Sequence, residues 1–199
     1  MPPKLIGIAG TNGSGKDTVG ELLAREHNYM FISVTDVLRA DLKSKGLPMS
    51  RENMRNLSSE WRSEHGLGVL VDKAKAMYEA LQGDYFGLAM ASLRNPGEAD
   101  SVHGYGGVVL WIDADPKIRY DRISGNRELR GRDRLVDDDK SFEEFLADEE
   151  VEMHHQAGGD ATTLSMSDVK AKSDLFLTND GNDLSALSRK LDELLGFNR

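Results

Sequence analysis

A short apolar run, Leu5–Ala9, leads directly into a loop that holds three glycines and a lysine. The loop reads Gly10-Thr-Asn-Gly-Ser-Gly-Lys16, and apolar residues at helical spacing, Val19, Leu22 and Leu23, follow it. The glycines permit backbone angles that side chains forbid, so successive N–H groups can turn inward and surround an anion. This order constrains the segment to a strand, a tight anion-binding loop and a helix.

The spacing Gly-x-x-x-x-Gly-Lys is that of the P-loop, which predicts a nucleoside triphosphate as the ligand. The positive end of the helix dipole would support the backbone N–H groups, and Lys16 would place its charge on the β- and γ-phosphates. A glycine-rich turn that arose by chance is the alternative, but the strand before the loop and the helix after it disfavour that interpretation. We therefore expect ATP to bind the following residues: Asn12, Gly13, Ser14, Gly15, Lys16, Asp17 and Thr18.

Asp17 departs from the motif, because a P-loop normally has Ser or Thr at this position to bind the magnesium ion. Magnesium prefers oxygen ligands and often combines a carboxylate with phosphates and water. We predict that Asp17 binds Mg²⁺, either directly or through water. The alternative is that Asp17 caps the helix and Thr18 supplies an oxygen.

Composition and charge exclude several functions. The chain has 199 residues, which suggests one domain, and its formal net charge is −9. A nucleic-acid-binding protein would usually carry a basic balance or stripe, so we expect no nucleic-acid partner. The chain has no cysteine, which rules out disulfides, thiolate metal sites and cysteine nucleophiles. No apolar run of membrane-spanning length and no signal peptide is seen, so we expect a soluble, cytoplasmic protein without a membrane partner.

Short apolar runs alternate with longer helical patterns, which predicts an α/β fold with a parallel sheet. The five predicted strands are Leu5–Ala9, Tyr29–Ser33, Tyr85–Ala91, Val108–Asp113 and Asp174–Thr178. Three helical patterns carry stripes that we expect to face the core. They are Val71, Ala74, Met77, Tyr78 and Leu81; Phe145 and Leu146 after the capping box Ser141-Phe-Glu-Glu144; and Leu184, Leu187, Leu191, Leu194 and Leu195, capped by Asn182 or Asp183.

Two polar stretches, 34–68 and 122–140, do not fit this core pattern. Together with the P-loop and the strand order, they make the chain resemble the nucleoside monophosphate kinase group of P-loop kinases. That group includes adenylate kinases, deoxynucleoside monophosphate kinases and dephospho-CoA kinases. The segments that carry the resemblance are Ser33-Val-Thr-Asp-Val-Leu-Arg39, Ser92-Leu-Arg94, Ile118-Arg-Tyr-Asp-Arg-Ile123 and Leu177-Thr-Asn-Asp-Gly181.

The resemblance implies a three-layer P-loop kinase with a five-stranded parallel sheet. Its core would comprise 1–33, 83–122 and 141–199, with an acceptor-binding insert at 34–82 and an arginine-rich lid at 123–140. Such an enzyme would transfer the γ-phosphoryl group of Mg-ATP to a nucleoside or deoxynucleoside 5′-monophosphate, a small-molecule acceptor.

Arginine residues in the polar stretches suit this reaction, because phosphoryl transfer depends on positioning and on neutralising charge. The resemblance implies that Arg39 and Arg94 contact the acceptor, and Arg62 is a further acceptor-binding candidate. In the lid, Arg127 and Arg132 are the arginines that we expect to stabilise the transferring group. The loop around Asn179 corresponds to the one near which the donor base lies in the family.

Two acidic positions leave alternatives open. Where the family has the motif Asp-Gly-x-Arg, this chain has Ala91-Ser-Leu-Arg94. The resemblance therefore implies that Ala91 replaces an aspartate that helps the family to hold magnesium, and that Asp17 supplies the carboxylate instead. Asp36 corresponds to the base of dephospho-CoA kinases, which phosphorylate a hydroxyl group, yet it could also contact a monophosphate acceptor or cap the following helix. A protein that binds ATP as a regulatory switch is the third interpretation, but it would not need arginines on two separate lobes.

Overall fold

Five parallel strands form the centre of the computed structural model, in the order β2-β3-β1-β4-β5. The structure describes residues 1–81, 83–125, 140–154 and 160–197. The strands are β1 Leu5–Gly10, β2 Tyr29–Ser33, β3 Gly87–Ala91, β4 Val108–Asp113 and β5 Leu175–Thr178. The predicted α/β class and parallel sheet are therefore confirmed, with β3 and β5 starting one or two residues later than predicted.

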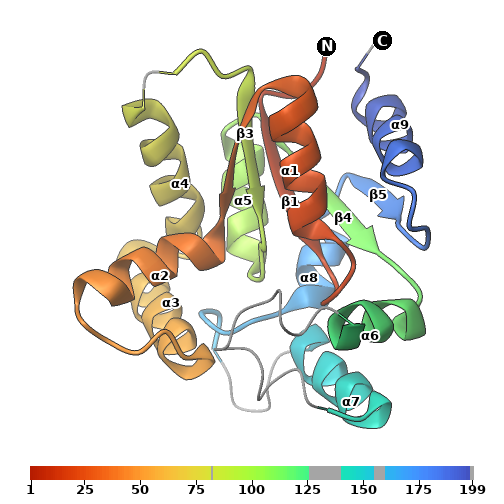
Figure 1. Cartoon of the computed structure of the whole chain (residues 1–199). Helices are drawn as coiled ribbons and strands as arrows, with labels where there is room; N and C mark the ends of the chain where they lie inside the picture. Colours follow the sequence, from red (N-terminus) through yellow and green to blue (C-terminus); the bar gives the residue numbers. More distant parts are fainter. Residues whose placement is uncertain (82, 126–139, 155–159, 198–199) are drawn as a thin grey trace.

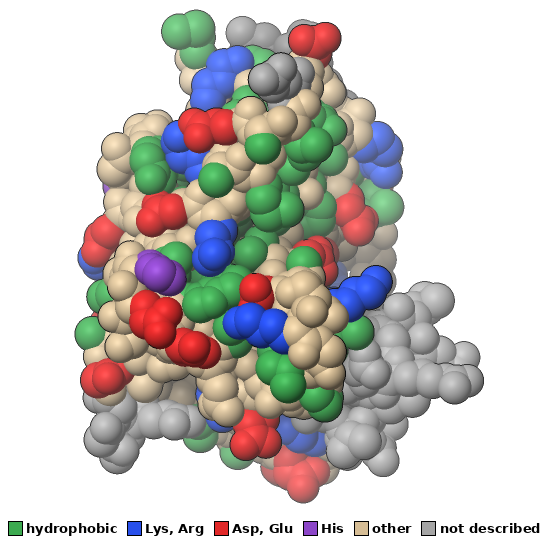
Figure 2. All heavy atoms as spheres, turned by 90° about the vertical axis from the view of Figure 1, so that its left-hand side faces the viewer, with side chains coloured by type: hydrophobic (Ala, Val, Ile, Leu, Met, Phe, Trp, Pro, Cys, Tyr) green, Lys and Arg blue, Asp and Glu red, His purple; other side chains and the backbone are tan. Residues whose placement is uncertain are grey.

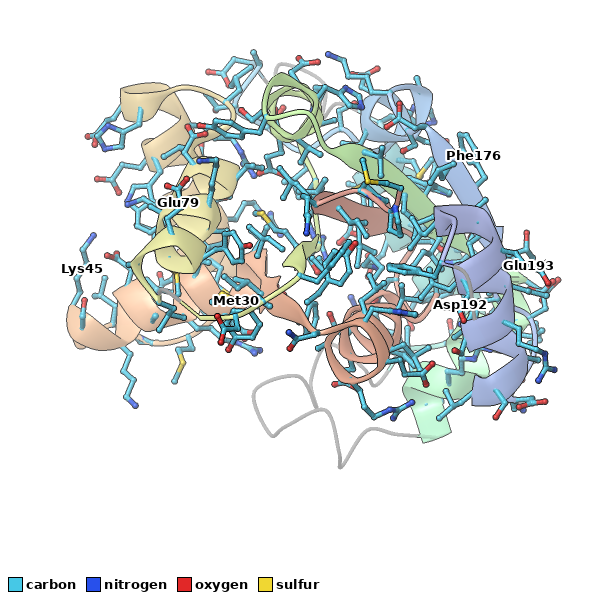
Figure 3. The ribbon with its side chains drawn as sticks, turned by 90° about the horizontal axis from the view of Figure 1, so that it is seen from above. Met30, Lys45, Glu79, Phe176, Asp192 and Glu193 are labelled. Atoms are coloured by element: carbon cyan, nitrogen blue, oxygen red, sulfur yellow. The ribbon has the colours of Figure 1, made fainter. Side chains whose placement is uncertain are left out.

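The inner strands are apolar along their length because helices cover both faces of the sheet. All six residues of β1 and all five of β3 are buried. Ile8 pairs with Ala91 of β3 and Leu110 of β4, so the carboxyl ends of the three inner strands lie level with one another. Figure 3 shows Met30 of β2 and Phe176 of β5 toward opposite sides of the molecule, as expected of the two edge strands.

Helices fill the two outer layers (Figure 1). Their bounds are α1 Lys16–His27, α2 Val34–Ser44, α3 Arg51–His65, α4 Val69–Ala80, α5 Pro96–Gly104, α6 Pro116–Gly125, α7 Phe142–Met153, α8 Met166–Ala171 and α9 Leu184–Leu195. One buried cluster joins α1 and α9 to one face of the sheet. A second cluster joins α2, α3, α4, α5 and α8 to the other face, which completes three layers.

Two predicted helix starts are confirmed by their caps. The Ser141 hydroxyl accepts from the Glu144 N–H and the Glu144 carboxylate accepts from the Ser141 N–H, which is the predicted capping box. Asp183, one of the two predicted caps of the last helix, accepts from the N–H groups of Ser185 and Ala186. These bonds satisfy N–H groups that a helix start otherwise leaves without partners.

The predicted core stripes are only partly correct. Val71 and Ala74 of α4 are fully buried, but Met77 is 44% exposed and Leu81 is 58% exposed. Leu184 at the start of α9 and Leu146 of α7 are exposed as well. Each stripe continues past the part of its helix that another element covers, and helical periodicity alone does not reveal where that cover ends.

The predicted insert 34–82 corresponds to α2, α3 and α4, which lie beside the β2 edge of the sheet (Figure 1). Its three helices pack on one another, and all three contribute buried residues to the cluster that covers this face of the sheet. Figure 2 shows the face that this region presents, where acidic and basic side chains are interspersed without a basic stripe. No helix within the described ranges is long and apolar enough to cross a bilayer.

Candidate functional site

The carboxyl ends of β1, β2 and β3 meet at one edge of the sheet, where α/β proteins commonly bind ligands. The P-loop follows β1, the segment Ser33–Arg39 follows β2, and Ser92–Arg94 follows β3. Because β3 lies between the other two strands, its end separates the P-loop from the insert. The chain termini lie at the opposite end of the sheet (Figure 1).

The P-loop takes a conformation that only glycine fits at its two ends. Gly10 has φ 144°, and a Cβ atom there would lie 2.0 Å from the Ile112 carbonyl oxygen. Gly15 has φ 97°, and its Cβ would lie 2.6 Å from Nδ2 of Asn179. The spaced glycines therefore allow the loop to approach the backbone of β4 and the Asn179 side chain closely, in addition to adopting left-handed angles.

Three other segments hold the loop by hydrogen bonds. Asn179, after β5, donates from Nδ2 to the Ser14 carbonyl at 2.8 Å. The Thr11 hydroxyl donates to Asp113 at the end of β4 at 2.7 Å. Arg119 of α6 donates from Nη1 to the Asn12 carbonyl at 3.3 Å. The structure thus places the predicted ATP-binding residue Asn179 directly against the loop.

Lys16 lies within the loop, with its ammonium group donating to the carbonyls of Gly10 at 3.0 Å and Thr11 at 2.6 Å. Burial, and then the positive charge of Arg94, lower the pKa of Lys16 from 10.5 to about 8. The carboxylates of Asp17 and Glu152 oppose this shift. An added polyanion would favour the charged form of Lys16 in the same way.

The chemistry expected of a magnesium ligand is present at Asp17. Its side chain is exposed in the first turn of α1 and lines the same cleft as Lys16 and Thr18. A carboxylate oxygen is a donor that magnesium prefers. Among the described residues no cluster of three or more His, Asp or Glu side chains is placed to hold a metal. An ion bound here would therefore take its other ligands from phosphate, water or the Thr18 hydroxyl.

One cleft of about 810 Å³ connects the P-loop with the insert. Its donor end includes Asn12, Gly13, Gly15, Lys16, Asp17, Thr18 and Asn179; its insert end includes Thr35, Asp36, Arg39, Met49, Met54, Arg55, Ser58 and Arg62; Ser92 and Arg94 lie between them. With the exception of Ser14, which is fully buried, every predicted site residue within the described ranges lines this cleft. Arg127 and Arg132 fall outside the residues that the structure describes.

Arg94 and Arg39 each form an ion pair at the edge of the cleft. Nη1 of Arg94 donates to Glu152 of α7 at 3.2 Å, and both side chains are about one-third exposed. Arg39 lies 3.7 Å from the Asp36 carboxylate, one helical turn away, and Asp36 is 65% exposed. Both arginines therefore face the cleft in loose ion pairs that a substrate phosphate could replace.

Arg62 is held much more tightly. Its side chain is 2% exposed, and Nη2 donates to Glu98 of α5 at 2.8 Å. Nη1 donates to the Thr162 carbonyl at 3.1 Å. The second oxygen of Glu98 accepts from the Arg94 N–H at 2.7 Å. Arg62 lines the cleft, but its closest partners make it a buried link between α3 and the turn that carries Arg94.

Several residues around the site were not singled out from the sequence. Asp113 ends a strand beside β1, which is a position that could have identified it. Arg119 is almost fully buried and binds Glu149 through two hydrogen bonds of 2.6 and 2.9 Å. Glu149 and Glu152 lie on α7, distant in sequence from their arginine partners, and no local pattern marks them.

Curated relatives cover nearly the whole chain. A UPF0200 protein of Methanococcus maripaludis strain C7 is 29% identical over 90% of this chain and 89% of its own length. A UPF0200 protein of Pyrococcus abyssi is 25% identical over 94% of this chain and 96% of its own length. Both relatives therefore match this chain over most of their own length.

Solved structures of kinases share the fold. A shikimate kinase from Bacteroides thetaiotaomicron superposes with a TM-score of 0.58 at 13% identity, covering 97% of this chain and 98% of that chain. A putative kinase from Chloroflexus aurantiacus gives a TM-score of 0.56 at 18% identity, covering 98% and 100%. The chain therefore has a P-loop kinase-like fold. The family model AAA_18, described as an AAA domain, matches residues 6–150. This chain belongs to that AAA domain family.

Proposed function

We propose that this protein transfers the γ-phosphoryl group of ATP to a small acceptor, a nucleoside or deoxynucleoside 5′-monophosphate. The observation that carries this proposal is the single cleft that runs from the P-loop to the insert. A donor site alone would need only the first half of it. The second half supplies separate cations for a second anionic molecule.

Each end of the cleft has a distinct task in this proposal. The P-loop N–H groups and Lys16 bind the β- and γ-phosphates, with the adenine base toward the loop after β5. Arg94 lies between the two ends and would contact the acceptor phosphate. Arg39 would bind the acceptor phosphate through its planar guanidinium group.

Asp17 would hold magnesium, and the bound ion would supply positive charge that neutralises the phosphates during transfer. Lys16 and Asp17 are sequence neighbours at the start of α1, so both would face the same phosphates. A carboxylate at this position repels a bare triphosphate. We therefore expect ATP to bind weakly when divalent metal is absent.

A nucleotide acceptor suits the mixture of side chains at the insert end. Phe31, Met49 and Met54 line the cleft together with Arg39 and Arg55. Apolar side chains can pack against a base, while the arginines bind a phosphate. This combination favours a nucleotide over an acceptor that is polar throughout.

A hydroxyl acceptor is the second candidate, and the exposure of Asp36 favours it. Asp36 lines the cleft, and among the described residues its carboxylate makes one charged contact, with Arg39 at 3.7 Å. Such a group could accept the proton of a hydroxyl that attacks the γ-phosphoryl group. Dephospho-CoA is the acceptor of this type that we propose, and Asp36→Asn would then abolish transfer.

An ADP-release assay tests both candidates. Purified protein with Mg-ATP is supplied with each ribo- and deoxynucleoside monophosphate and with dephospho-CoA. Release that only a monophosphate stimulates supports the first candidate, and release that only dephospho-CoA stimulates supports the second. If no acceptor raises ADP release above background, the kinase proposal is wrong and an ATP-binding regulatory role becomes the better interpretation.

Arg94→Ala tests how the cleft is divided. We expect a higher KM for the acceptor with nearly unchanged ATP affinity, since Arg94 lies beyond the P-loop. Arg189→Ala is the matched control, because Arg189 is exposed on α9 and outside the cleft. Equal losses of acceptor and ATP affinity would show that Arg94 belongs to the donor site instead.

A further inference from the structure

Ser92 has an unusual backbone conformation. In the part of the chain that the structure describes, only Asn28 and Ser92 are non-glycine residues with positive φ, at 57° and 73°. Asn28 is the left-handed C-cap of α1, a place where asparagine is common, and its side chain donates to the Asp84 carbonyl at 2.5 Å. Ser92 follows a strand and has no comparable local reason for this angle.

Neighbouring contacts fix this conformation of Ser92. Its N–H donates to the Ile8 carbonyl of β1 at 2.9 Å. The next side chain, Leu93, is fully buried and fills the space beside Gly7, where a Cβ atom would lie 2.6 Å from Leu93 Cδ1. The Arg94 N–H is held by Glu98. Strained residues persist when their surroundings determine them in this way, and they concentrate at functional sites.

Ser92 lies between the P-loop and the segment that follows β2, where both proposed substrates would meet. Ser92 directly follows β3, which lies between β1 with its P-loop and β2 with the acceptor segment. Its side chain lines the cleft between these two ends. No hydrogen bond from its hydroxyl to another residue is found within the described ranges. A donor is thus available at the boundary between the two proposed substrates.

We propose that the Ser92 hydroxyl donates a hydrogen bond to an oxygen of the γ-phosphoryl group of bound ATP. This inference rests on the proposed function, because it takes the nucleotide and its orientation from there. Glycine would adopt the same turn without strain. Serine at this position costs stability, and a contact made only with the third phosphate explains why a hydroxyl is present. Ser92 is then a positioning contact for the group that is transferred.

The test compares two substitutions by calorimetric titration with Mg-ATP and Mg-ADP. Ser92→Ala keeps the side-chain strain but removes the hydroxyl. We expect it to weaken ATP binding roughly tenfold and to leave ADP binding unchanged, since ADP lacks the third phosphate. An ATP-to-ADP affinity ratio that stays within about twofold of the wild-type ratio would overturn the proposal.

Ser92→Gly separates the strain from the contact. It should lower the affinity ratio as Ser92→Ala does, while raising the melting temperature by about 2–4 °C because glycine relieves the positive φ. Asn28→Gly is the matched control, because it also places glycine at a positive φ but lies at the far end of α1. The control should leave the affinity ratio unchanged, and a drop equal to that of Ser92→Gly would contradict the proposed contact.

The two proposals fail in different experiments. The ADP-release assay depends on an acceptor, whereas the affinity ratio is measured without one. If no acceptor stimulates ADP release but Ser92→Ala lowers the affinity ratio, the kinase proposal is wrong and the γ-phosphoryl contact stands. If acceptors stimulate release and the ratio does not change, the kinase proposal stands and the Ser92 proposal is wrong.

Discussion

The P-loop end of the cleft is held by hydrogen bonds from the ends of β4 and β5 and from α6. At the insert end, Arg39 and Asp36 meet only through a 3.7 Å contact, and Asp36 is mostly exposed. The donor end is therefore preorganised before any ligand binds, whereas Arg39 and Asp36 at the insert end can adjust their side chains. Preorganised donors are the arrangement expected where charge must be stabilised without rearrangement.

We expect the insert end of the cleft, and not the P-loop end, to determine which acceptor binds. A triphosphate presents the same groups to every P-loop, so a fixed loop serves it well. The acceptor is the variable partner, and side chains with loose contacts can be replaced without disturbing the core.

The largest expected effect concerns the link between the two ends. Glu98 is fully buried and holds both Arg62 of α3 and the N–H of Arg94. Glu98→Ala would leave a buried guanidinium group without its carboxylate, which typically costs 3–5 kcal/mol, so we expect roughly that loss in the free energy of unfolding. Denaturant titration followed by circular dichroism measures it.

The control for this substitution is Glu193→Ala, because Glu193 is exposed on α9 (Figure 3). Its effect should stay within about 0.5 kcal/mol. Glu98→Gln keeps an acceptor for the Arg94 N–H and should lose less stability than Glu98→Ala. Equal stability of Glu98→Ala and wild type would show that Arg62 and Glu98 do not join the insert to the core.

Lys16→Ala should have the next largest effect. Removing a preorganised charge from the donor end is expected to lower the rate of ADP release by about 10²–10³-fold. The Lys16 ammonium group donates to two carbonyls of the loop itself, which fixes its charge beside the P-loop N–H groups. Lys190→Ala, on the exposed face of α9, is the control. Wild-type turnover in Lys16→Ala would remove the P-loop from the mechanism.

Arg39→Ala should produce a smaller and more selective effect. We expect the KM for the stimulating acceptor to rise by roughly 10–100-fold, as for a lost charge-assisted hydrogen bond. The affinity for ATP should remain nearly constant, because Arg39 lies at the insert end. Lys43→Ala, exposed on the same helix, serves as the control in steady-state kinetics. A matching loss of ATP affinity would contradict the division of the cleft.

The sequence predicted the donor end better than the insert end, and the reason is physical. The P-loop combines glycines, a strand and a helix within a few residues, so its geometry is determined locally. The five strands were predictable because buried parallel strands are continuous apolar runs. The burial of Arg62 depends on Glu98, thirty-six residues away in the chain, and no local pattern reports such a pair.

The positive φ of Ser92 also could not be predicted from the sequence. A serine after a strand does not suggest a positive φ, because the angle follows from the packing of Leu93 and the bonds of its neighbours. The roles predicted for Arg127 and Arg132 remain predictions, since both residues lie outside the described ranges. Functional geometry here depends mainly on contacts between distant segments, whereas the class of ligand is encoded in one contiguous motif.

The smallest expected effect is a pH dependence at the donor end. Burial and the charge of Arg94 lower the pKa of Lys16 to about 8, so free protein loses this charge as the pH rises through that value. Bound triphosphate favours the charged form and raises the pKa of Lys16. The Kd for Mg-ATP should therefore be nearly constant below pH 8 and increase up to tenfold between pH 8 and 9.

Stability should follow the opposite trend, which separates this effect from alkaline unfolding. The unfolded chain holds the Lys16 proton up to a pKa of 10.5, whereas the folded protein releases it near pH 8. The unfolded state thus binds more protons between these values, so the contribution of Lys16 to stability increases with pH. Titrating wild type and Lys16→Ala with Mg-ATP at several pH values from 7 to 9 tests the predicted change in Kd. Weak, pH-independent ATP binding is expected in the variant, and an identical pH profile in both proteins would assign the effect to another group.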